Sequence, residues 1–158
     1  MIPQIHLLLH NIRSTHNVGA ILRTADAVGV AKVYFSGYTP APIDRFGRNR
    51  SDITKASLGA EKSVAWETVE SPIEFIKKLK KDKYTILSLE QDPKSIDYRE
   101  VKLKNNTLLI VGNEVDGVEK DILDLSDEIL EIPMLGQKES LNVSVATGIV
   151  LYSIQKLP

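Results

Sequence analysis

Cysteine is absent from this 158-residue sequence, and no apolar run approaches the length of about 18 residues that a membrane span requires. Without cysteine the chain has no disulfide, no thiol nucleophile and no cysteine-liganded metal site, which favours a cytoplasmic protein. The N-terminus also lacks the long apolar region and cleavage pattern of a signal peptide. The three histidines, His6, His10 and His16, have no carboxylate at metal-ligand spacing, so we expect surface or strand-end residues and no metal site.

An excess of positive charge is missing as well. The formal net charge is −1, which gives no global signature of a nucleic-acid-binding protein. The local exception is a turn-like segment in which Arg45, Arg48 and Arg50 surround Phe46 and Gly47. Such a loop can contact phosphates through its guanidinium groups and stack a base on its aromatic ring. Taken alone, the segment fits a solvated surface loop better than an RNA-binding loop.

The sequence does contain an alternation of strand-like and helix-like segments, in a chain whose length suits one domain. Apolar runs predict strands over residues 5–9, 31–35, 63–66, 84–89, 107–111 and 128–132. Helical spacing of apolar residues predicts helices over 17–28, 72–81, 120–125 and 142–157. The alternation predicts an α/β fold with a mostly parallel sheet and helices on both faces. The polar connection over 38–57 is longer than an idle loop, so we expect a functional loop there.

The segment from 142 to 157 has helical length and is apolar nearly all round. Such a helix is buried over most of its surface. At the end of a small domain, burial of this extent indicates a partner subunit, so we expect a homodimer.

The predicted helix that starts at Asn17 carries the first group of residues with chemical potential. Asn17 lies where a side-chain oxygen can cap the first helical turn. Gly19 leaves room for a ligand or a neighbouring backbone. Arg23 lies about 100° around the helix from the buried stripe, so it can point along the edge of the sheet. In an arbitrary protein, the same pattern describes a capped amphipathic helix with one exposed arginine.

Two further segments set polar residues beside apolar sequence. In 112–117, glycines bracket Asn113, Glu114 and Asp116 directly after an apolar strand. In 132–144, a strand runs into a loop with apolar side chains and free backbone groups, which suits a flat heteroaromatic ring. Ligands of open α/β sheets bind beyond the carboxyl ends of the strands, so we expect one composite site there. The dinucleotide-binding and Walker fingerprints are absent.

These three segments resemble the motifs of the SpoU (TrmH-like) branch of the SPOUT RNA methyltransferases, and the resemblance covers essentially the whole chain. Asn-x-Gly-x-x-x-Arg is present as Asn17, Gly19 and Arg23. Gly-x-Glu-x-x-Gly begins at Gly112, and Ile-Pro-Met followed by Ser-Leu-Asn-Val-Ser spans 132–144. Unlike larger members, the chain is expected to be a single catalytic domain, 1–158, without an added RNA-binding domain.

The resemblance implies a trefoil knot near the C-terminus, a homodimer and bound S-adenosylmethionine. It implies an RNA substrate and methylation of a ribose 2′-oxygen. The motifs do not distinguish tRNA from rRNA, and we take tRNA over rRNA as the expected substrate. Its motif positions assign the cofactor-binding residues, which are Leu89, Gly112, Ile132 and Leu141. They likewise assign the catalytic positions, which are Arg23, Asn17, Glu114, Ser140 and Asn142.

The role of Arg23 is open at this stage. The family proposal makes it a base for the ribose hydroxyl, but a guanidinium with a pKa above about 12 is a poor base. We therefore favour stabilisation of developing alkoxide charge, with phosphate or water accepting the proton. A catalytically silent RNA-binding protein and an RNA base methyltransferase are the alternative functions, and the intact motif residues argue against both.

Overall fold

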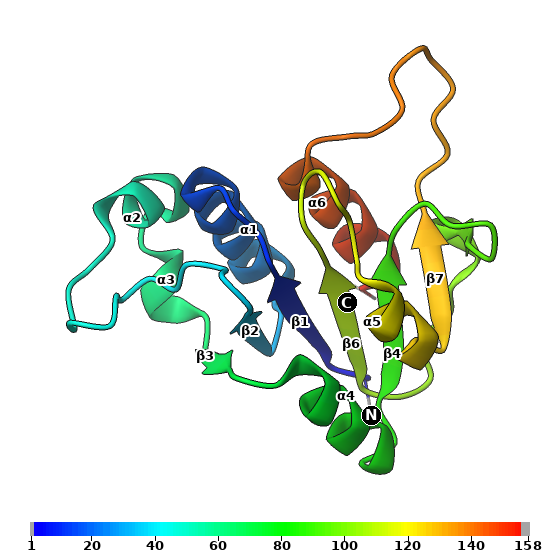
Figure 1. Ribbon diagram of the computed structural model, residues 1–158, viewed down its shortest axis with the longest axis horizontal. Helices are drawn as coiled ribbons and strands as arrows, with labels where there is room; N and C mark the ends of the chain where they lie inside the picture. Colours follow the sequence, from blue (N-terminus) through cyan, green and yellow to red (C-terminus); the bar gives the residue numbers. More distant parts are fainter. Residues whose placement is uncertain (1, 156–158) are drawn as a thin grey trace.

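The computed structural model describes residues 2–155 and contains a seven-stranded sheet in which every pairing is parallel (Figure 1). The strand order is β3-β2-β1-β6-β4-β7-β5. The strands are β1 Ile5–His10, β2 Lys32–Ser36, β3 Trp66–Val69, β4 Thr85–Leu89, β5 Ile96–Asp97, β6 Thr107–Val111 and β7 Glu128–Glu131. The predicted α/β class and parallel sheet are confirmed.

Helices cover both faces of the sheet, as expected. They are α1 Thr15–Val28, α2 Ser51–Ser57, α3 Ala60–Ser63, α4 Pro72–Lys81, α5 Lys120–Leu125 and α6 Val143–Ile154, with a 3-10 turn, η1, at Tyr98–Glu100. Helices α1 and α6 pack side by side on one face, together with α2 and α3 next to α1 (Figure 1). Helices α4 and α5 lie against the other face. Within residues 2–155, no helix combines the length and the apolar character that a bilayer crossing needs.

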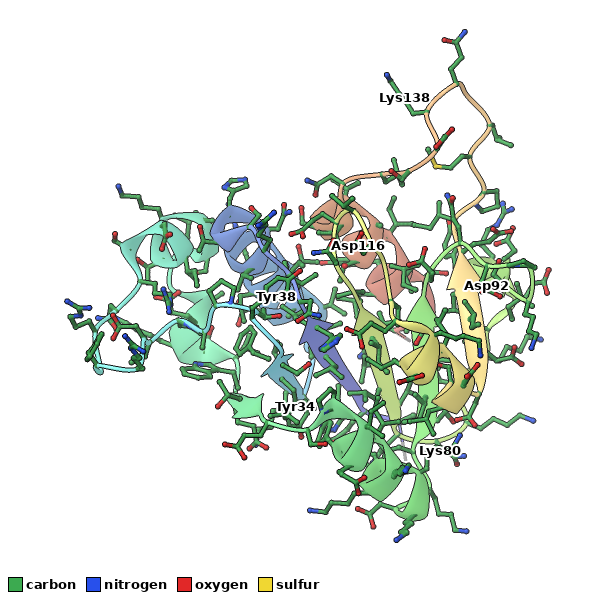
Figure 2. All side chains as sticks on the ribbon, in the orientation of Figure 1. Tyr34, Tyr38, Lys80, Asp92, Asp116 and Lys138 are labelled. Atoms are coloured by element: carbon green, nitrogen blue, oxygen red, sulfur yellow. The ribbon has the colours of Figure 1, made fainter. Side chains whose placement is uncertain are left out.

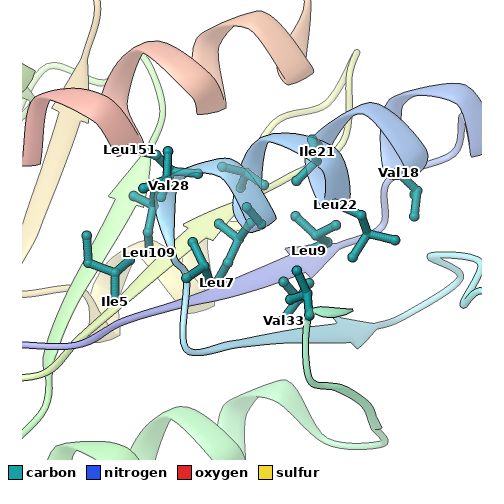
Figure 3. Close-up of a cluster of buried hydrophobic side chains, with 14 of the residues drawn as sticks. Ile5, Leu7, Leu9, Val18, Ile21, Leu22, Val28, Val33, Leu109 and Leu151 are labelled. Atoms are coloured by element: carbon teal, nitrogen blue, oxygen red, sulfur yellow. The ribbon is translucent and has the colours of Figure 1, made fainter. Parts of the chain in front are cut away.

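The continuous apolar sequence of β1 follows from burial on both of its faces. Leu7 and Leu9 point into the cluster beneath α1 and α6, which Figure 3 shows in close-up. Leu8 points into the cluster beneath α4 and α5. Successive side chains of a strand alternate between the faces of a sheet, so a strand covered on both sides has no polar face.

Local signals fix the helix ends. Ser14 accepts a hydrogen bond from the backbone N–H of Asn17 and caps α1, and Gly29 ends the helix at a φ of 81°. The predicted start at Asn17 is therefore wrong, because the capping side chain is Ser14. Helix α6 begins one residue after its cap, Asn142, and Leu157, the expected end, lies outside the described residues.

Of the other predicted helices and strands, some have the expected bounds and some do not. The helix over 72–81, the strand over 107–111 and the helix over 120–125 are confirmed as α4, β6 and α5. The strand expected over 63–66 is β3, which only begins at Trp66. The connection over 38–57 contains α2, which has two buried residues, Ile53 and Ser57, too few to show helical periodicity. Helix α2 is also what approaches Gly19, where an added Cβ would lie 2.6 Å from the carbonyl oxygen of Ile53.

Two of the three histidines are buried, which contradicts the expectation of surface residues for His6. His6, on β1, packs between the rings of Tyr34 and Tyr84. His10, at the end of β1, forms hydrogen bonds with Ser36 and Glu119. His16 is exposed on α1. Among the described residues, no group of three His, Asp or Glu side chains is arranged to hold a metal ion.

Candidate active site

The strand order changes direction between β1 and β6, and this places a crevice at the carboxyl edge of the sheet. After β1 the chain continues through α1 on one face, whereas after β6 it continues through α5 on the opposite face. The two connections diverge, and open α/β proteins bind ligands where this happens. A cavity of about 620 Å³ lies beyond the ends of β4, β6 and β7. Figure 2 labels Tyr38 and Asp116 near this edge, and Lys138 near the tip of the loop that extends away from it.

This first cavity brings together eight of the nine residues that the motifs assign to catalysis and cofactor binding. They are Asn17, Leu89, Gly112, Glu114, Ile132, Ser140, Leu141 and Asn142. They come from the start of α1, the ends of β4, β6 and β7, and the loop that precedes α6. The expectation that distant motifs form one composite site agrees with this placement.

A chain of side-chain hydrogen bonds joins the three motifs. The amide of Asn17 donates to Oε1 of Glu114 at 3.2 Å, and the amide of Asn142 donates to Oδ1 of Asn17 at 3.2 Å. Asn142 in turn accepts from the backbone N–H of Ser144 at 2.9 Å and so caps α6. Asn17 is thus a connecting residue and not a helix cap.

Glu114 is held as a carboxylate. Its oxygens accept hydrogen bonds from the backbone N–H groups of Arg13 and Ser14, each at 3.2 Å, as well as from Asn17. Burial by itself raises the pKa of Glu114, but hydrogen bonding to its own backbone N–H, together with the bonds from Arg13, Ser14 and Asn17, outweighs burial and holds the pKa below its ordinary value. A charged, fully engaged carboxylate orients its neighbours and is not available as a general acid.

The turn after β6 is tight because of its glycines. The backbone groups of Asn113 and Gly117 hydrogen-bond to each other, at 3.2 and 3.0 Å. A Cβ on Gly112 would lie 2.5 Å from the carbonyl oxygen of Gly117. Gly117 has a φ of 70°, and a Cβ there would meet the carboxylate of Glu90. This close packing presents the backbone of the turn directly to the cavity.

The loop over 132–142 forms the outer wall of the cavity and extends away from the body of the protein (Figure 1). Gln91 ties it to the end of β4 by donating to the carbonyl oxygen of Glu139 at 2.6 Å. Leu135 in this loop is 97% exposed, and Val115 in the facing turn is 90% exposed. Apolar side chains with this exposure beside a cavity are suited to a partner ring or surface.

Arg23 is the motif residue that the fold does not bring to the cavity. It is exposed on α1 and lines neither of the cavities described here. The sequence predicted that Arg23 lies off the buried stripe of its helix, and its exposure confirms this prediction.

The three arginines of the 45–50 loop also lie outside the first cavity. Arg48 forms an ion pair with Asp44 at 3.0 Å, and the guanidinium groups of Arg45 and Arg48 lie over the ring of Phe46 at 4.8 and 4.9 Å. The backbone N–H and side chain of Arg48, with the N–H of Phe46, hold the pKa of the Asp44 carboxyl below its ordinary value. Arg45 and Arg50 line a second cavity next to the first.

Sequence reasoning noted Asn113 as a polar residue of the second motif without giving it a role, and it missed Glu90. Asn113 donates to the carbonyl oxygen of Asn11 at 3.0 Å and to the Tyr38 hydroxyl at 2.6 Å. Glu90 accepts from the backbone N–H of Val118 at 2.8 Å. A signal was available for both, since Asn113 lies inside the second motif and Glu90 directly follows Leu89 at a strand end.

Fold and cavity together define an open, parallel α/β protein with its site at a topological switch point. The chain belongs to the SpoU rRNA Methylase family, whose model matches residues 4–152. A tRNA (guanosine(18)-2'-O)-methyltransferase of Aquifex aeolicus is 36% identical over 146 residues, which cover 92% of this chain and 66% of the relative. A 23S rRNA (guanosine-2'-O-)-methyltransferase of Neisseria meningitidis is 34% identical over 94% of this chain and 57% of its own length. The chain thus spans no more than about two thirds of these relatives.

Solved structures agree with this assignment. The A. aeolicus TrmH/SpoU tRNA modifying enzyme superposes with a TM-score of 0.84 and 34% identity, over 96% of this chain and 74% of that one. The SpoU methyltransferase AviRb from Streptomyces viridochromogenes, in complex with the cofactor AdoMet, superposes with a TM-score of 0.84 and 25% identity, over 97% of this chain and 60% of that one.

Proposed function

We propose that this protein transfers a methyl group from S-adenosylmethionine to a ribose 2′-oxygen in structured RNA, with tRNA as the preferred substrate over rRNA. The observation that carries the proposal is the hydrogen-bonded chain Glu114–Asn17–Asn142, which joins all three family motifs at one cavity. The relatives named above support the reaction, and their names include both tRNA and rRNA enzymes.

The first cavity fits the cofactor in size and chemistry. Its volume of about 620 Å³ lies within the usual range of roughly 300–1,000 Å³ for small-molecule sites. Leu89, Ile132 and Leu141 supply apolar contacts, and Gly112 gives access to backbone polar groups that a larger residue would obstruct. S-adenosylmethionine supplies a methyl group on a sulfonium, which is electrophilic without further activation. The residues of this chain therefore need only bind, orient and manage a proton.

We assign Asn17, Glu114, Ser140, Asn142 and Arg23 to the substrate side. Glu114 fixes Asn17, and Asn17 with Asn142 presents amide groups next to the cavity, where Ser140 adds a hydroxyl. Alignment of a nucleophile in this way supplies roughly 7–11 kcal/mol of barrier reduction. Arg23 stabilises the negative charge that develops on the ribose 2′-oxygen. Phosphate or water accepts the proton that the ribose hydroxyl loses.

Arg23 lines neither cavity of its own chain, and we propose that a homodimer brings it to the cavity of the partner. On α6, three side chains spaced along one stripe are exposed, namely Val145 at 50%, Ile149 at 36% and Tyr152 at 49%. Helix α1, which carries Arg23, lies next to α6, and Gly148 faces Thr24 between them. We propose that the α1–α6 face forms the dimer interface and that Arg23 serves the partner's cavity.

Arg45, Arg48 and Arg50 are proposed to bind RNA phosphates. The trefoil knot, the single-domain organisation and the cytoplasmic location stay predictions of the family resemblance and the composition.

The decisive experiment is to map 2′-O-methyl positions in cellular RNA with and without this protein. Loss of one ribose methylation supports the proposal. Loss of a base methylation would favour the base-methyltransferase alternative, and unchanged RNA together with RNA binding would favour a catalytically silent protein.

A further inference from the structure

A second cavity, of about 780 Å³, lies beside the first at the carboxyl edge of the sheet. Its walls come from Arg13, which follows β1, from the 37–45 segment, which follows β2, and from Trp66 and Thr68 of β3. The first cavity lies over β4, β6 and β7, so the two cavities divide this edge at the boundary between β1 and β6.

The two cavities share a wall. The hydroxyl of Tyr38, which lines the second cavity, accepts a hydrogen bond at 2.6 Å from Asn113, which lines the first. The backbone N–H of Arg13 donates to Glu114, another residue of the first cavity, at 3.2 Å. Tyr38 is itself held by Asn11, whose Oδ1 accepts from the Tyr38 backbone N–H at 3.1 Å. Hydrogen bonds between residues of the two linings thus join the two cavities.

The second cavity is lined by more positively than negatively charged side chains, and one of its lining arginines has a donor without a partner. Arg13, Arg45 and Arg50 line it, against one carboxylate, Asp44, whose charge is already engaged by Arg48. Within residues 2–155, Nε of Arg50 is buried and has no hydrogen-bond acceptor. A buried donor without an acceptor costs free energy, and an anion in the cavity removes that cost.

Aromatic surface completes the lining. Tyr38 is 58% exposed, and Trp66 is half-buried with its ring edge-to-face against Phe35. Sites for single-stranded nucleic acid combine guanidinium groups with aromatic rings. The guanidinium groups contact the phosphates, and the rings stack on the bases. An acidic peptide would use the arginines and leave the rings without a role.

We infer that the second cavity binds the nucleotide adjacent to the methylated one, with its phosphodiester on Arg13 and Arg50 and its base against the Tyr38–Trp66 side. This inference rests on the proposed function, because the first cavity defines which nucleotide is adjacent. It separates the arginines of the second cavity, Arg13, Arg45 and Arg50, from Arg48, which pairs with Asp44 and does not line the cavity.

Trp66 is the only tryptophan in the sequence and lines the second cavity, so its fluorescence is a probe of that cavity. We would titrate the full chain with unfractionated tRNA, with mixed-sequence hexaribonucleotides, with inorganic phosphate and with S-adenosylmethionine. Both RNAs should quench Trp66, and S-adenosylmethionine should not. Quenching by inorganic phosphate at the same concentration as the hexaribonucleotides would identify a simple anion site and overturn the inference.

Arg13→Gln and Arg50→Gln should each weaken hexaribonucleotide binding and flatten the slope of log K against log salt by about 0.7 for each lost phosphate contact. Arg50→Lys keeps the charge without the Nε donor and should restore the slope but not the full affinity. Lys78→Gln removes one exposed charge on α4, far from the cavity, and is the matched control. Thermal unfolding by circular dichroism establishes that each variant is folded.

Cofactor calorimetry on the unmodified protein separates the two ways in which these ideas can fail. If the protein binds S-adenosylmethionine and methylates tRNA, while both glutamine variants keep normal RNA affinity and salt slope, the inference is wrong and the proposed function stands. If it binds no S-adenosylmethionine, the proposed function fails and the identity of the adjacent nucleotide fails with it.

Discussion

The amide of Asn17 donates a hydrogen bond to Glu114 across 97 positions of sequence. This contact links the start of α1 to the turn after β6, and Asn142 extends it to the start of α6. Each of the three motifs therefore contributes one polar side chain to the same chain of bonds. A change in any of these residues is expected to disturb the positions of the other two.

Arg23→Ala should leave affinity for S-adenosylmethionine nearly unchanged and reduce methyl transfer by roughly 10²–10³-fold or more, the usual effect of removing a group that stabilises developing charge. The reason is that Arg23 does not line the first cavity of its own chain, and in the proposed dimer it acts on the substrate side of the partner's cavity. Calorimetry with the cofactor and a methyl-transfer assay on tRNA measure the two effects. A comparable loss of cofactor binding would remove Arg23 from the substrate side.

Gly112→Ala should weaken cofactor binding, because the new Cβ would lie 2.5 Å from the carbonyl oxygen of Gly117. Overpacking of this kind typically costs about 1–3 kcal/mol. Gly136→Ala is the matched control, since a Cβ at Gly136 meets no atom within 4 Å. Equal cofactor affinities of the two variants would show that the turn after β6 does not hold the cofactor.

Ile149→Asp should dissociate the dimer or unfold the chain, because an unpaired charge in an apolar interface costs several kcal/mol. Light scattering at micromolar concentration measures the mass. Leu135→Asp changes a side chain that is equally apolar and more exposed, away from α6, and should leave the mass unchanged. A monomeric mass for the unmodified protein would refute the dimer.

Replacement of Arg45, Arg48 and Arg50 together by alanine should weaken RNA binding and reduce its salt dependence by roughly 0.7–0.9 log units for each lost phosphate contact. Binding of S-adenosylmethionine provides the control, since none of the three lines the first cavity. Normal RNA affinity and salt slope in this variant would show that the loop is solvated surface.

His6 should make stability depend on pH below about 6.5, its ordinary pKa. Burial, with a smaller contribution from the charge of Lys32, lowers the pKa of His6 below its ordinary value. The unfolded chain therefore binds the proton first, so stability is complete above the unfolded pKa of about 6.5 and decreases as the pH falls below it. Urea unfolding across this range should show a weaker pH dependence in His6→Phe, whereas His16→Gln, at an exposed position, should behave like the unmodified protein.

Some parts of the fold follow from local patterns. The apolar run of β6 and the Pro72 start of α4 were predicted to the residue, because burial and capping act over a few neighbouring positions. Helix α2 was missed, since seven residues with two buried positions carry too little periodicity. The burial of His6 was also missed, because it depends on Tyr34 of β2 and on Tyr84, which directly precedes β4.

The sequence by itself determined the layered α/β class, the bounds of α4 and the motif residues that mark the family, because these depend on residue type at short spacing. Only the tertiary structure decided which of those residues meet. The strand order places β6 between β1 and β4, and this brings Asn17, Glu114 and Asn142 to one cavity while it leaves Arg23 outside. It also builds the arginine-lined second cavity next to the first. Contacts between residues 97 and 125 positions apart depend on how the strands are ordered, and no local pattern of side chains encodes that order.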